Sequence, residues 1–508
     1  MDMAYDMERH SSPEATTEWL KRWATSEFGS EVASSTAAVM NKYGILVGRR
    51  KYELLSNVPF AFSTVHYDEA EQNLASWELL LSDAETIYNG LDDKTRIAFF
   101  QMVLHPILAG KTVVELYTKT ALNALYFQQG RASTNILAQE ARDAFAQDAE
   151  ITDQYHSLNG GKWASFVDQV HIGYTSWNDP PNNENIMPTV RDLGEPSVPG
   201  SFGVAIQGST AVFPDVGSLN LRSVDPFMPP TESRYVDIFS RENSTTSYAI
   251  TSNVSYVTVS NQKGSIGPSG HGLDIRSAIT VDWEKAPQGL SLAKLTVSGN
   301  DDSEASLILP VNKTSIPADF SGFVESNGVI SIEAAHYSAA EEKNGVSYVK
   351  IPHYGRTKSA VKAWPVTMES QNPTDGPALT YSIYTTTTSN SPRLIVYLGS
   401  SHNHDPTRWI KFAYSIDDSE PVTVRPVPAD PPYKEGAAWS KAVVENGWTS
   451  TLQLGAVIEP GAHKLSLWLL EPGAVLQKVA LDLGGYHSTA LGPPESWTRT
   501  KPSCRRTV

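Results

Sequence analysis

The segment Asn159-Gly-Gly-Lys162-Trp163-Ala-Ser-Phe-Val-Asp168-Gln-Val-His171-Ile-Gly-Tyr174-Thr-Ser-Trp177-Asn-Asp-Pro-Pro181 divides the chain into two parts with different hydrophobic periodicity. Before it, apolar residues recur every three to four positions, which is typical of amphipathic α-helices. After about residue 203, apolar and polar residues alternate in short runs separated by Gly and Pro, which is typical of antiparallel β-strands. The sequence therefore predicts a multidomain protein, α then all-β: an antiparallel helical bundle followed by two antiparallel β-sandwiches.

The first part of the chain is predicted to fold into a series of helices. Ser12-Pro13-Glu14 is a clear helix start, because it combines a capping hydroxyl, a proline suited to the first helical position and an acid in the first turn. Gly44 and Pro106 are expected to end helices. Short turns between amphipathic helices favour an antiparallel bundle. The expected helices cover about residues 14–28, 31–43, 67–89, 94–104, 107–129 and 132–154.

The second part of the chain is predicted to form two β-sandwiches, with residues 475–482 closing the sheet of the second one. Period-2 alternation is visible at residues 254–259 and 273–283, and the expected strands of the second sandwich include residues 329–334, 393–398 and 461–468. The predicted domains are residues 1–200 (helical bundle with its aromatic, Gly- and Pro-rich closing segment), 201–318 (accessory β-sandwich) and 319–495 (C-terminal β-sandwich), followed by a frayed tail at 496–508.

The composition limits the classes of function. Of the 508 residues, 40% are hydrophobic and 19% are charged, so the chain is neither disordered nor a typical membrane protein. The formal net charge of −16 is unfavourable for nucleic-acid binding, which needs clustered Lys and Arg. The apolar runs are shorter than the ~20 residues that span a bilayer, so we expect no membrane insertion. With one cysteine, Cys504, no intrachain disulfide can form.

The N-terminus and three sequons give conflicting indications of the cellular compartment. The first ten residues have no basic start, no apolar stretch and no small-residue cleavage site, so they do not resemble a signal peptide. Asn243, Asn253 and Asn312 each begin an Asn-X-Ser/Thr pattern and are glycosylation candidates, although such short patterns also arise by chance. Together the two observations raise the question of whether Met1 is the true start.

Common catalytic and cofactor motifs are missing from the sequence, which lacks GxGxxG, a P-loop, GxSxG and HExxH. His402-Asn-His404-Asp405 superficially resembles a metal-binding pair, but it lies in a polar loop and no third or fourth ligand is evident. Acidic pairs such as Asp417-Asp418 lie in turn contexts, where Asp bonds to the local backbone. We therefore expect no metal site and no cofactor.

The aromatic segment quoted above is the first candidate binding site. Sugars stack their C–H faces on aromatic rings, while their hydroxyls need polar partners. The candidate carbohydrate-binding residues in this segment are Lys162, Trp163, Asp168, His171, Tyr174 and Trp177. The alternative is a loop that wraps across the helices, with Trp163 and Trp177 packed into the core.

Several strings in the chain resemble the xylan α-glucuronidases of glycoside hydrolase family 115. The aromatic segment is the most specific of them, and it continues to Met187-Pro188. Residues 203–315 resemble only a generic accessory sandwich. The other similar strings, in the same order as in the family, are Trp19-Leu20, Trp23-Ala24, Phe28-Gly29, Arg49–Leu55, Ala98–Gln101, His105-Pro106, Gln129–Ser133, Ile332–Tyr337, Gly355–Thr357, Pro472–Lys478, Gly484-Gly485 and Leu491–Ser496.

The resemblance implies an architecture and an activity. Members of the family combine an α/β domain, a (β/α) barrel, a helical bundle and a C-terminal sandwich. They remove glucuronic acid or its 4-O-methyl form from xylan with inversion, which needs a general acid and a general base with room for water between them. The barrel supplies the catalytic carboxylates. This sequence contains no barrel-like region, so no catalytic residue is assigned. The resemblance also implies an extracellular parent protein.

Three hypotheses follow from these observations. The first is that the chain is the non-barrel, C-terminal region of a xylan α-1,2-glucuronidase and is inactive alone. The second is a non-catalytic protein that binds xylan or glucuronoxylan through exposed aromatics. Trp439 and Trp448 are further candidates for this role, with ordinary sandwich packing as the alternative for both. The third is a structural role, in which the helical domain forms a homodimer.

Overall fold

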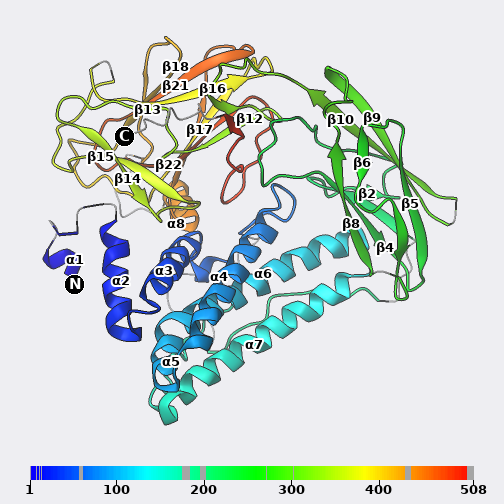
Figure 1. Ribbon diagram of the computed structural model, residues 1–508, viewed down its shortest axis with the longest axis horizontal. Helices are drawn as coiled ribbons and strands as arrows, with labels where there is room; N and C mark the ends of the chain where they lie inside the picture. Colours follow the sequence, from blue (N-terminus) through cyan, green and yellow to red (C-terminus); the bar gives the residue numbers. More distant parts are fainter. Residues whose placement is uncertain are drawn as a thin grey trace. The chain divides into compact units, whose positions relative to one another are not determined.

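The computed structural model describes residues 2–6, 9–10, 12, 14–55, 61–173, 183–194, 202–270, 272–300, 302–373, 375–428 and 436–499 (Figure 1). The chain forms two compact units. The first consists of residues 1–51, 79–107 and 316–508, and the second of residues 52–78 and 108–315. Each unit combines helices with one β-sandwich. Along the chain, a helical region precedes two sandwiches, which confirms the predicted fold class. The domain boundaries given above remain a prediction.

The first unit begins with helices α1 (Asp2–Tyr5), α2 (Ala15–Phe28) and α3 (Ala33–Gly48). The N-cap of α2 is Glu14 and not the predicted Ser12. Asn41 of α3 donates a hydrogen bond from Nδ2 to Thr17 Oγ1 of α2 at 2.9 Å. The helix α3 continues past Gly44, where the sequence predicts its end, because the buried Leu46 extends the apolar face by another turn.

A continuous helical stretch, Asp93–Gln129, begins in the first unit and ends in the second. It consists of α5 (Asp93–Phe99), the π-helical segment η2 (Phe100–Leu104) and α6 (His105–Gln129). The predicted break before Pro106 is wrong. The wider π-helical turn, in which the His105 N–H donates to Phe100 O, accommodates a residue that has no N–H of its own.

The stretch Asp93–Gln129 is also the one helix in the described part of the chain that is long and apolar enough to cross a membrane. The sequence predicts no such segment, because its apolar runs are shorter than the ~20 residues that span a bilayer. Half of the apolar window is buried inside the protein. A helix in the core of a folded domain has the same composition, and the absence of membrane insertion stays a prediction.

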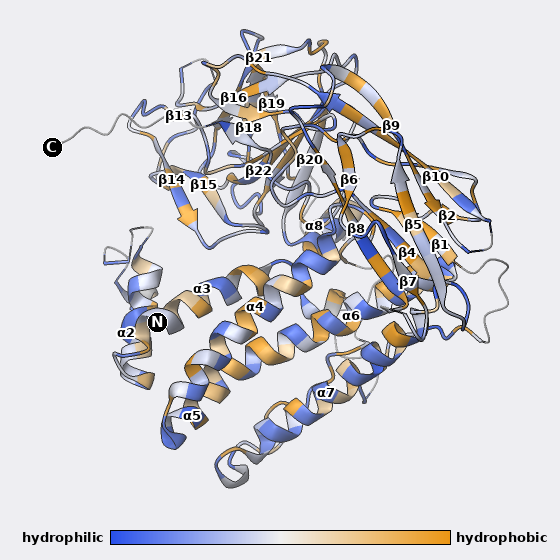
Figure 2. Cartoon of the chain, turned by 45° about the vertical axis from the view of Figure 1, so that its right-hand side comes forward, coloured by the Kyte–Doolittle hydropathy of each residue, from blue (hydrophilic) through white to orange (hydrophobic). Residues whose placement is uncertain are grey.

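The helices of the second unit are the short 3-10 helix η1 (Tyr52–Leu54), the first half of α4 (Glu69–Gly90), most of α6, and α7 (Thr134–Gly161). Helices α6 and α7 are antiparallel. Lys119 Nζ lies 2.8 Å from Glu140 Oε2, and Thr112 Oγ1 donates to Gln147 Oε1 at 3.4 Å, so the numbers rise along one helix and fall along the other. Figure 2 shows hydrophilic and hydrophobic colours alternating along α7, as expected of an amphipathic helix.

The sandwich of the second unit consists of two five-stranded sheets, in the orders β2-β1-β4-β8-β6 and β3-β10-β9-β5-β7. Its pairs are antiparallel except β3 with β10. Apolar side chains from both sheets form one core. The strands are β1 (Phe202–Ile206), β2 (Val212–Phe213), β3 (Ser218–Asn220), β4 (Tyr235–Ser240), β5 (Thr246–Ser252), β6 (Val257–Val259), β7 (Lys263–Ile266), β8 (Asp274–Val281), β9 (Gly289–Ser298) and β10 (Glu304–Lys313).

The sandwich of the first unit consists of a seven-stranded sheet, with the path β19-β18-β21-β16-β11-β23 and β13 beside β16, and a six-stranded sheet, with the path β14-β15-β22-β17-β20 and β12 beside β22. Its elements are β11 (Gly322–Val324), β12 (Val329–Glu333), β13 (Ala339–Ala340), β14 (Ser347–Pro352), β15 (Ser359–Trp364), β16 (Leu379–Thr385), β17 (Arg393–Leu398), β18 (Phe412–Ile416), β19 (Val422–Val424), α8 (Ala437–Glu445), β20 (Trp448–Gln453), β21 (Gly461–Leu469), β22 (Val475–Asp482) and β23 (Thr498–Arg499). The strand predicted to close the sheet, β22, instead lies inside it.

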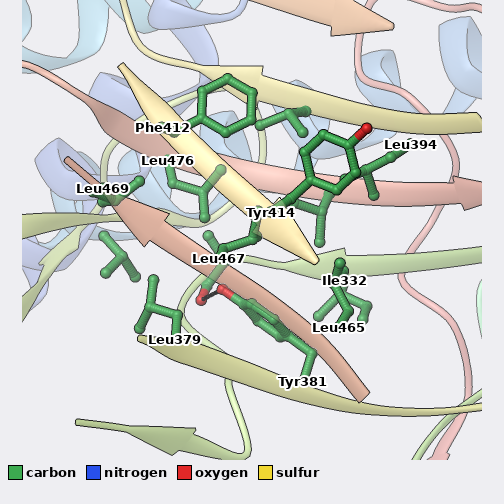
Figure 3. Packing of buried hydrophobic residues seen from close by; sticks show 14 of the residues in the cluster. Ile332, Leu379, Tyr381, Leu394, Phe412, Tyr414, Leu465, Leu467, Leu469 and Leu476 are labelled. Carbon is green, nitrogen blue, oxygen red and sulfur yellow. Dashed lines mark hydrogen bonds between the residues drawn. The ribbon is translucent and has the colours of Figure 1, made fainter. Parts of the chain in front are cut away.

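The core of this sandwich lies between its two sheets (Figure 3). Leu467 of β21 is opposite Leu379 of β16 and Tyr414 of β18 in the seven-stranded sheet. Leu394 and Leu476 come from the six-stranded sheet, and both are fully buried. Apolar side chains of both sheets therefore meet in one shared core between them.

Candidate functional site

The aromatic segment of the sequence analysis lies at the end of α7. Asn159 and Gly160 have positive φ angles of 49° and 69°, so the helix stops at the Asn-Gly-Gly string. Lys162 is exposed, and its Nζ lies 5.0 Å from the centre of the Trp163 ring. The Trp163 ring meets Phe166 edge to face at 5.6 Å. Phe166 is 67% exposed and was not predicted as a site residue, although it belongs to the same string.

His171 fastens this segment to α7. Its Nε2 lies 2.8 Å from Asp148 Oδ1, and Asp148 is buried. The backbone N–H groups of His171 and Ile172 donate to Asn185 Oδ1 at 2.9 and 3.1 Å, and the N–H of Gly173 donates to the hydroxyl of Tyr117 at 3.2 Å. These contacts hold the segment against α6 and α7.

The remaining candidate residues of the segment are Asp168, Tyr174 and Trp177. Asp168 is exposed and lies 3.4 Å from His156 Nε2 on α7. Tyr174 and Trp177 lie outside the described residues. Sugar binding by this segment stays a prediction.

The His171–Asp148 contact is expected to depend on pH. Burial by itself lowers the pKa of His171, but the hydrogen bond and the charge of Asp148 outweigh it, so the pKa of His171 is raised above 6.5. The contact therefore stabilises the segment fully at low pH and loses this contribution as pH rises through the raised pKa. We expect the His171 and Ile172 amides to lose about fivefold hydrogen-exchange protection, roughly 1 kcal/mol, since the imidazole is partly exposed.

Hydrogen exchange corrected for the intrinsic rate, measured at pH 5.5 and 8.5, tests this expectation. In the variant His171→Asn the protection is expected to be low and the same at both values. His404→Asn, at an exposed histidine of the other unit, is the control and is expected to behave as the unmodified protein. Protection that is equal at both pH values in the unmodified protein contradicts the prediction.

A second candidate site lies where α8 joins β20. Asn446, at the end of α8, has a positive φ of 52°, and Gly447 follows it. A Cβ atom at Gly447 would lie 2.4 Å from the carbonyl oxygen of Leu398, so only glycine fits this turn. The tight turn brings Trp439 of α8 and Trp448 of β20 to the same hollow.

This hollow, here called the α8 hollow, has a volume of about 190 Å³ and is lined by both tryptophans together with Lys51, Ser400 and His402, among others. Trp448 is only 7% exposed and packs in the sandwich core, and its Nε1 donates to Ser401 O at 2.8 Å. Trp439 is half-buried at the edge of the same core. Trp439 therefore offers the larger surface to a ligand, and sugar binding by either residue stays a prediction.

Hydrogen bonds connect the wall of the α8 hollow to the N-terminal helices. Ser400 Oγ donates to Asn446 Oδ1 at 3.1 Å. Asn446 Nδ2 donates to the carbonyl oxygen of Gly48, at the end of α3, at 2.7 Å. In the same region Arg49 Nε donates to the carbonyl oxygen of Arg356 at 3.1 Å. The end of α3 is thus part of the structure that supports the hollow.

The charges behind the α8 hollow are mainly positive. Arg356 is 4% exposed, and its Nη2 lies 3.7 Å from Glu445 Oε2. Glu445 also lies 3.6 Å from Lys441 Nζ. The pKa of Arg50 is lowered by burial and by the nearby charge of Arg356, against the opposing effect of Glu445. This group of basic side chains around one carboxylate favours an anionic ligand over a cationic one.

Several family-like strings of the C-terminal part meet in a polar cluster formed by Glu333, His336, Thr357, Lys358, Lys478 and Glu495. Within it, Thr357 Oγ1 donates to Glu333 Oε2 at 2.7 Å, and Lys478 Nζ lies 3.9 Å from Glu333 Oε1. Both Glu333 and Lys478 are buried. These strings belong to the resemblance described above, and no local sequence pattern connects residues 333 and 478 or predicts a role for them.

The exposed end of the polar cluster is centred on Glu495. Its carboxylate lies 2.5 Å from His336 Nδ1 and 3.1 Å from Lys358 Nζ. Burial would raise the pKa of Glu495, but these two partners outweigh it and lower the pKa to about 2. The pKa of His336 is raised, mainly by its hydrogen bond to Glu495. Both carboxylates of the cluster are thus held by partners, and the cluster fastens the C-terminal segment to β12.

The metal and glycosylation expectations concern other parts of the chain. Among the described residues, no group of three or more His, Cys, Asp or Glu side chains is arranged to hold a metal ion.

Asn243 and Asn253 are exposed next to strand β5, and Asn253 Oδ1 accepts a hydrogen bond from the backbone N–H of Lys294 at 2.7 Å. Asn312 is half-buried within β10. Glycosylation at these positions stays a prediction.

Known protein families match the two ends of the chain. Residues 322–495 match the model for the glycosyl hydrolase family 115 C-terminal domain, and residues 1–54 match the model for glycosyl hydrolase family 115. None of the curated protein sequences matches the chain.

Solved structures are similar to the chain at low sequence identity. BtGH115A, a family GH115 4-O-methyl-α-glucuronidase with specificity for decorated arabinogalactans, has 14% identity and a TM-score of 0.51 over 94% of this chain and 43% of its own. The C-terminal CBM6 of the laminarinase LamC from Zobellia galactanivorans has 14% identity and a TM-score of 0.21 over 30% of this chain and 98% of its own. A family 35 carbohydrate-binding module from Clostridium thermocellum has 10% identity and a TM-score of 0.20 over 30% and 97%.

The likeness to BtGH115A shows a shared fold, in which helices precede β-sandwiches, and the chain spans 43% of the length of that enzyme. The N-terminal and C-terminal segments of the chain are both matched by models of glycosyl hydrolase family 115, and these matches support a member of that family.

Proposed function

We propose that this chain is the helical and sandwich region of a xylan α-1,2-glucuronidase that removes 4-O-methyl-glucuronic acid from glucuronoxylan with inversion, and that it has no hydrolytic activity alone. One observation carries the proposal. The two family-matched segments, residues 1–54 and 322–495, are far apart in sequence, yet most of the first packs with the second in one compact unit. The bonds from Arg49 to Arg356 and from Asn446 to Gly48 join them.

The expected lack of activity follows from the chemistry of inversion. An inverting glycosidase needs two carboxyl groups that stand about 6.5–9.5 Å apart with a water between them. The described residues that line the α8 hollow include no Asp or Glu. The carboxylates nearest to it and in the polar cluster, Glu445, Glu333 and Glu495, are occupied by basic or hydroxyl partners. The described residues also contain no (β/α) barrel.

Incubation of the purified chain with 4-O-methyl-glucuronoxylan tests the catalytic part of the proposal. We expect the uronic acid released to equal that of a blank without protein, while an active family 115 α-glucuronidase in the same buffer releases it readily. Release above the blank that increases with the concentration of the chain overturns the assignment of catalysis to residues outside this chain.

The alternative function is non-catalytic binding of hemicellulose, and the α8 hollow favours it. Trp439 offers an aromatic surface, and Lys51, Ser400 and His402 offer polar groups beside it. Affinity electrophoresis in a gel that contains glucuronoxylan measures this binding. We expect the chain to be retarded, Trp439→Ala to migrate at least halfway back to the mobility in a plain gel, and the control Trp409→Ala to be retarded as before. A mobility that is unchanged by the polysaccharide contradicts binding.

Three finer expectations remain part of the proposal. They are a homodimer formed through the helices, an extracellular location of the whole protein, and glycans on the sequons.

A further inference from the structure

A separate hollow lies between the start of α2 and the hairpin of β14 and β15. It has a volume of about 280 Å³, and its lining includes Ser12, Thr16, Val349, Ile351, Lys362 and Trp364. We call it the hairpin hollow. Figures 1 and 2 both show α2 next to this hairpin, and all of these residues belong to the first compact unit. None of its lining residues lines the α8 hollow.

The strand register places two of these side chains on the outer face of the hairpin. Trp364 and Lys362 are two residues apart on β15 and therefore point to the same side, together with Val349, which is opposite Lys362 on β14. The intervening Ala363 is fully buried in the sandwich core. Lys350 also touches the hollow, but it alternates to the other face, where its Nζ lies 4.7 Å from the centre of the Tyr337 ring.

Trp364 provides an apolar surface in this hollow. It is 39% exposed, which is unusual for the largest aromatic side chain at the surface of a sandwich. Beside it are the side chains of Val349 and Ile351, which are half-buried. An exposed indole with apolar neighbours suits the C–H face of a sugar ring.

Lys362 provides an unbalanced positive charge in the same hollow. It is half-buried, and burial lowers the pKa of its amine. Among the described residues, no carboxylate lies within ion-pair distance of it, in contrast to Lys358 and Lys411 on the same sandwich. A partly desolvated ammonium gains most from an anionic partner, and a carboxylate of a ligand can provide it.

We propose that the hairpin hollow is a second saccharide-binding site that recognises a uronic acid residue of a polysaccharide. The indole of Trp364 stacks on the ring, the ammonium of Lys362 pairs with the carboxylate, and the hydroxyls of Ser12 and Thr16 on the opposite wall bind sugar hydroxyls. The site involves no hydrolysis, so it stands or falls independently of the proposed enzymatic function. Together with the α8 hollow it would allow one chain to bind a decorated polysaccharide at two points.

The test is an NMR titration of the full chain with its tryptophans labelled with nitrogen-15. The indole N–H signal of Trp364 is assigned from its loss in Trp364→Phe. Three probes are used: xylotetraose with one 4-O-methyl-glucuronic acid branch, undecorated xylotetraose and trigalacturonate. We expect the Trp364 signal to shift with the decorated tetrasaccharide at an affinity at least tenfold above that for the undecorated one. A shift with trigalacturonate as well shows that the uronate is recognised whichever backbone carries it.

Variants of the lysine complete the test. Lys362→Met is expected to lower the affinity for the acidic probes at least tenfold and to leave binding of undecorated xylotetraose unchanged. Lys294→Met, at an exposed lysine of the other sandwich, is the matched control and is expected to have no effect. The proposal is overturned if the Trp364 signal does not move with either acidic probe. Equal affinities for the decorated and undecorated tetrasaccharides, or for the two lysine variants, also overturn it.

Discussion

Replacing Glu333 with alanine is expected to lower the free energy of unfolding of the C-terminal sandwich by about 3 kcal/mol. Glu333 is 2% exposed, and its carboxylate accepts a hydrogen bond from Thr357 and faces the buried ammonium of Lys478. The substitution removes the negative charge and leaves the positive one in a region that water does not reach. Native-state hydrogen exchange of the slowest amides in β12 and β22 measures the change.

Two further variants separate the charge effect from a general loss of packing. Glu341→Ala removes an exposed carboxylate from the same sandwich and is expected to cost less than about 0.5 kcal/mol. The double variant Glu333→Leu with Lys478→Met removes both charges, and we expect it to be more stable than the sum of the single changes predicts. Equal stabilities of Glu333→Ala and Glu341→Ala would falsify the prediction.

Replacing Leu467 with alanine is the second change with a large expected effect, a loss of about 2–5 kcal/mol in the free energy of unfolding. Leu467 is fully buried in the C-terminal half of β21, between Leu379 and Tyr414 of the neighbouring strands (Figure 3). The close-packed neighbours relax only in part around the missing methyl groups, so a cavity adds to the lost transfer free energy.

The matched control is Leu79→Ala, the same substitution at a leucine of α4 that is 69% exposed in the same compact unit. It is expected to change the stability by less than about 0.5 kcal/mol. The slowest-exchanging amides of β16 and β21 again provide the measurement. A loss in Leu467→Ala no larger than in Leu79→Ala would show that the space between the sheets is loosely filled.

The fold could be predicted from the sequence where a local pattern decides the structure. The strand-like runs at 329–334, 393–398 and 461–468 became β12, β17 and β21. The Asn159-Gly160 string ended α7 because both residues adopt left-handed backbone angles. Predictions based on a single residue were less dependable. Pro106 did not end its helix, because the preceding π-helical turn accommodates it, and Gly44 lies inside α3.

The site was harder to predict, because it depends on contacts between residues far apart in sequence. The composition of the sequence predicts Trp439 and Trp448 as candidate binding residues. That Trp448 is buried and Trp439 only half-buried follows from the register of β20 and the turn before it. The hairpin hollow needs the start of α2 opposite β15, a pairing that no local pattern reveals. Within one strand, however, the spacing of Lys362 and Trp364 was a usable signal, since residues two apart share a face.

The interleaved order of the two units has a consequence for how the protein is made. Gly48 leaves the ribosome 398 residues before its partner Asn446, and Arg49 leaves it 307 residues before its partner Arg356. At roughly 5–20 residues per second, the N-terminal helices wait on the order of 15–80 s for the sandwich that covers them. The second unit ends at residue 315, so its complete sequence is available before that of the first unit, and we expect it to fold first.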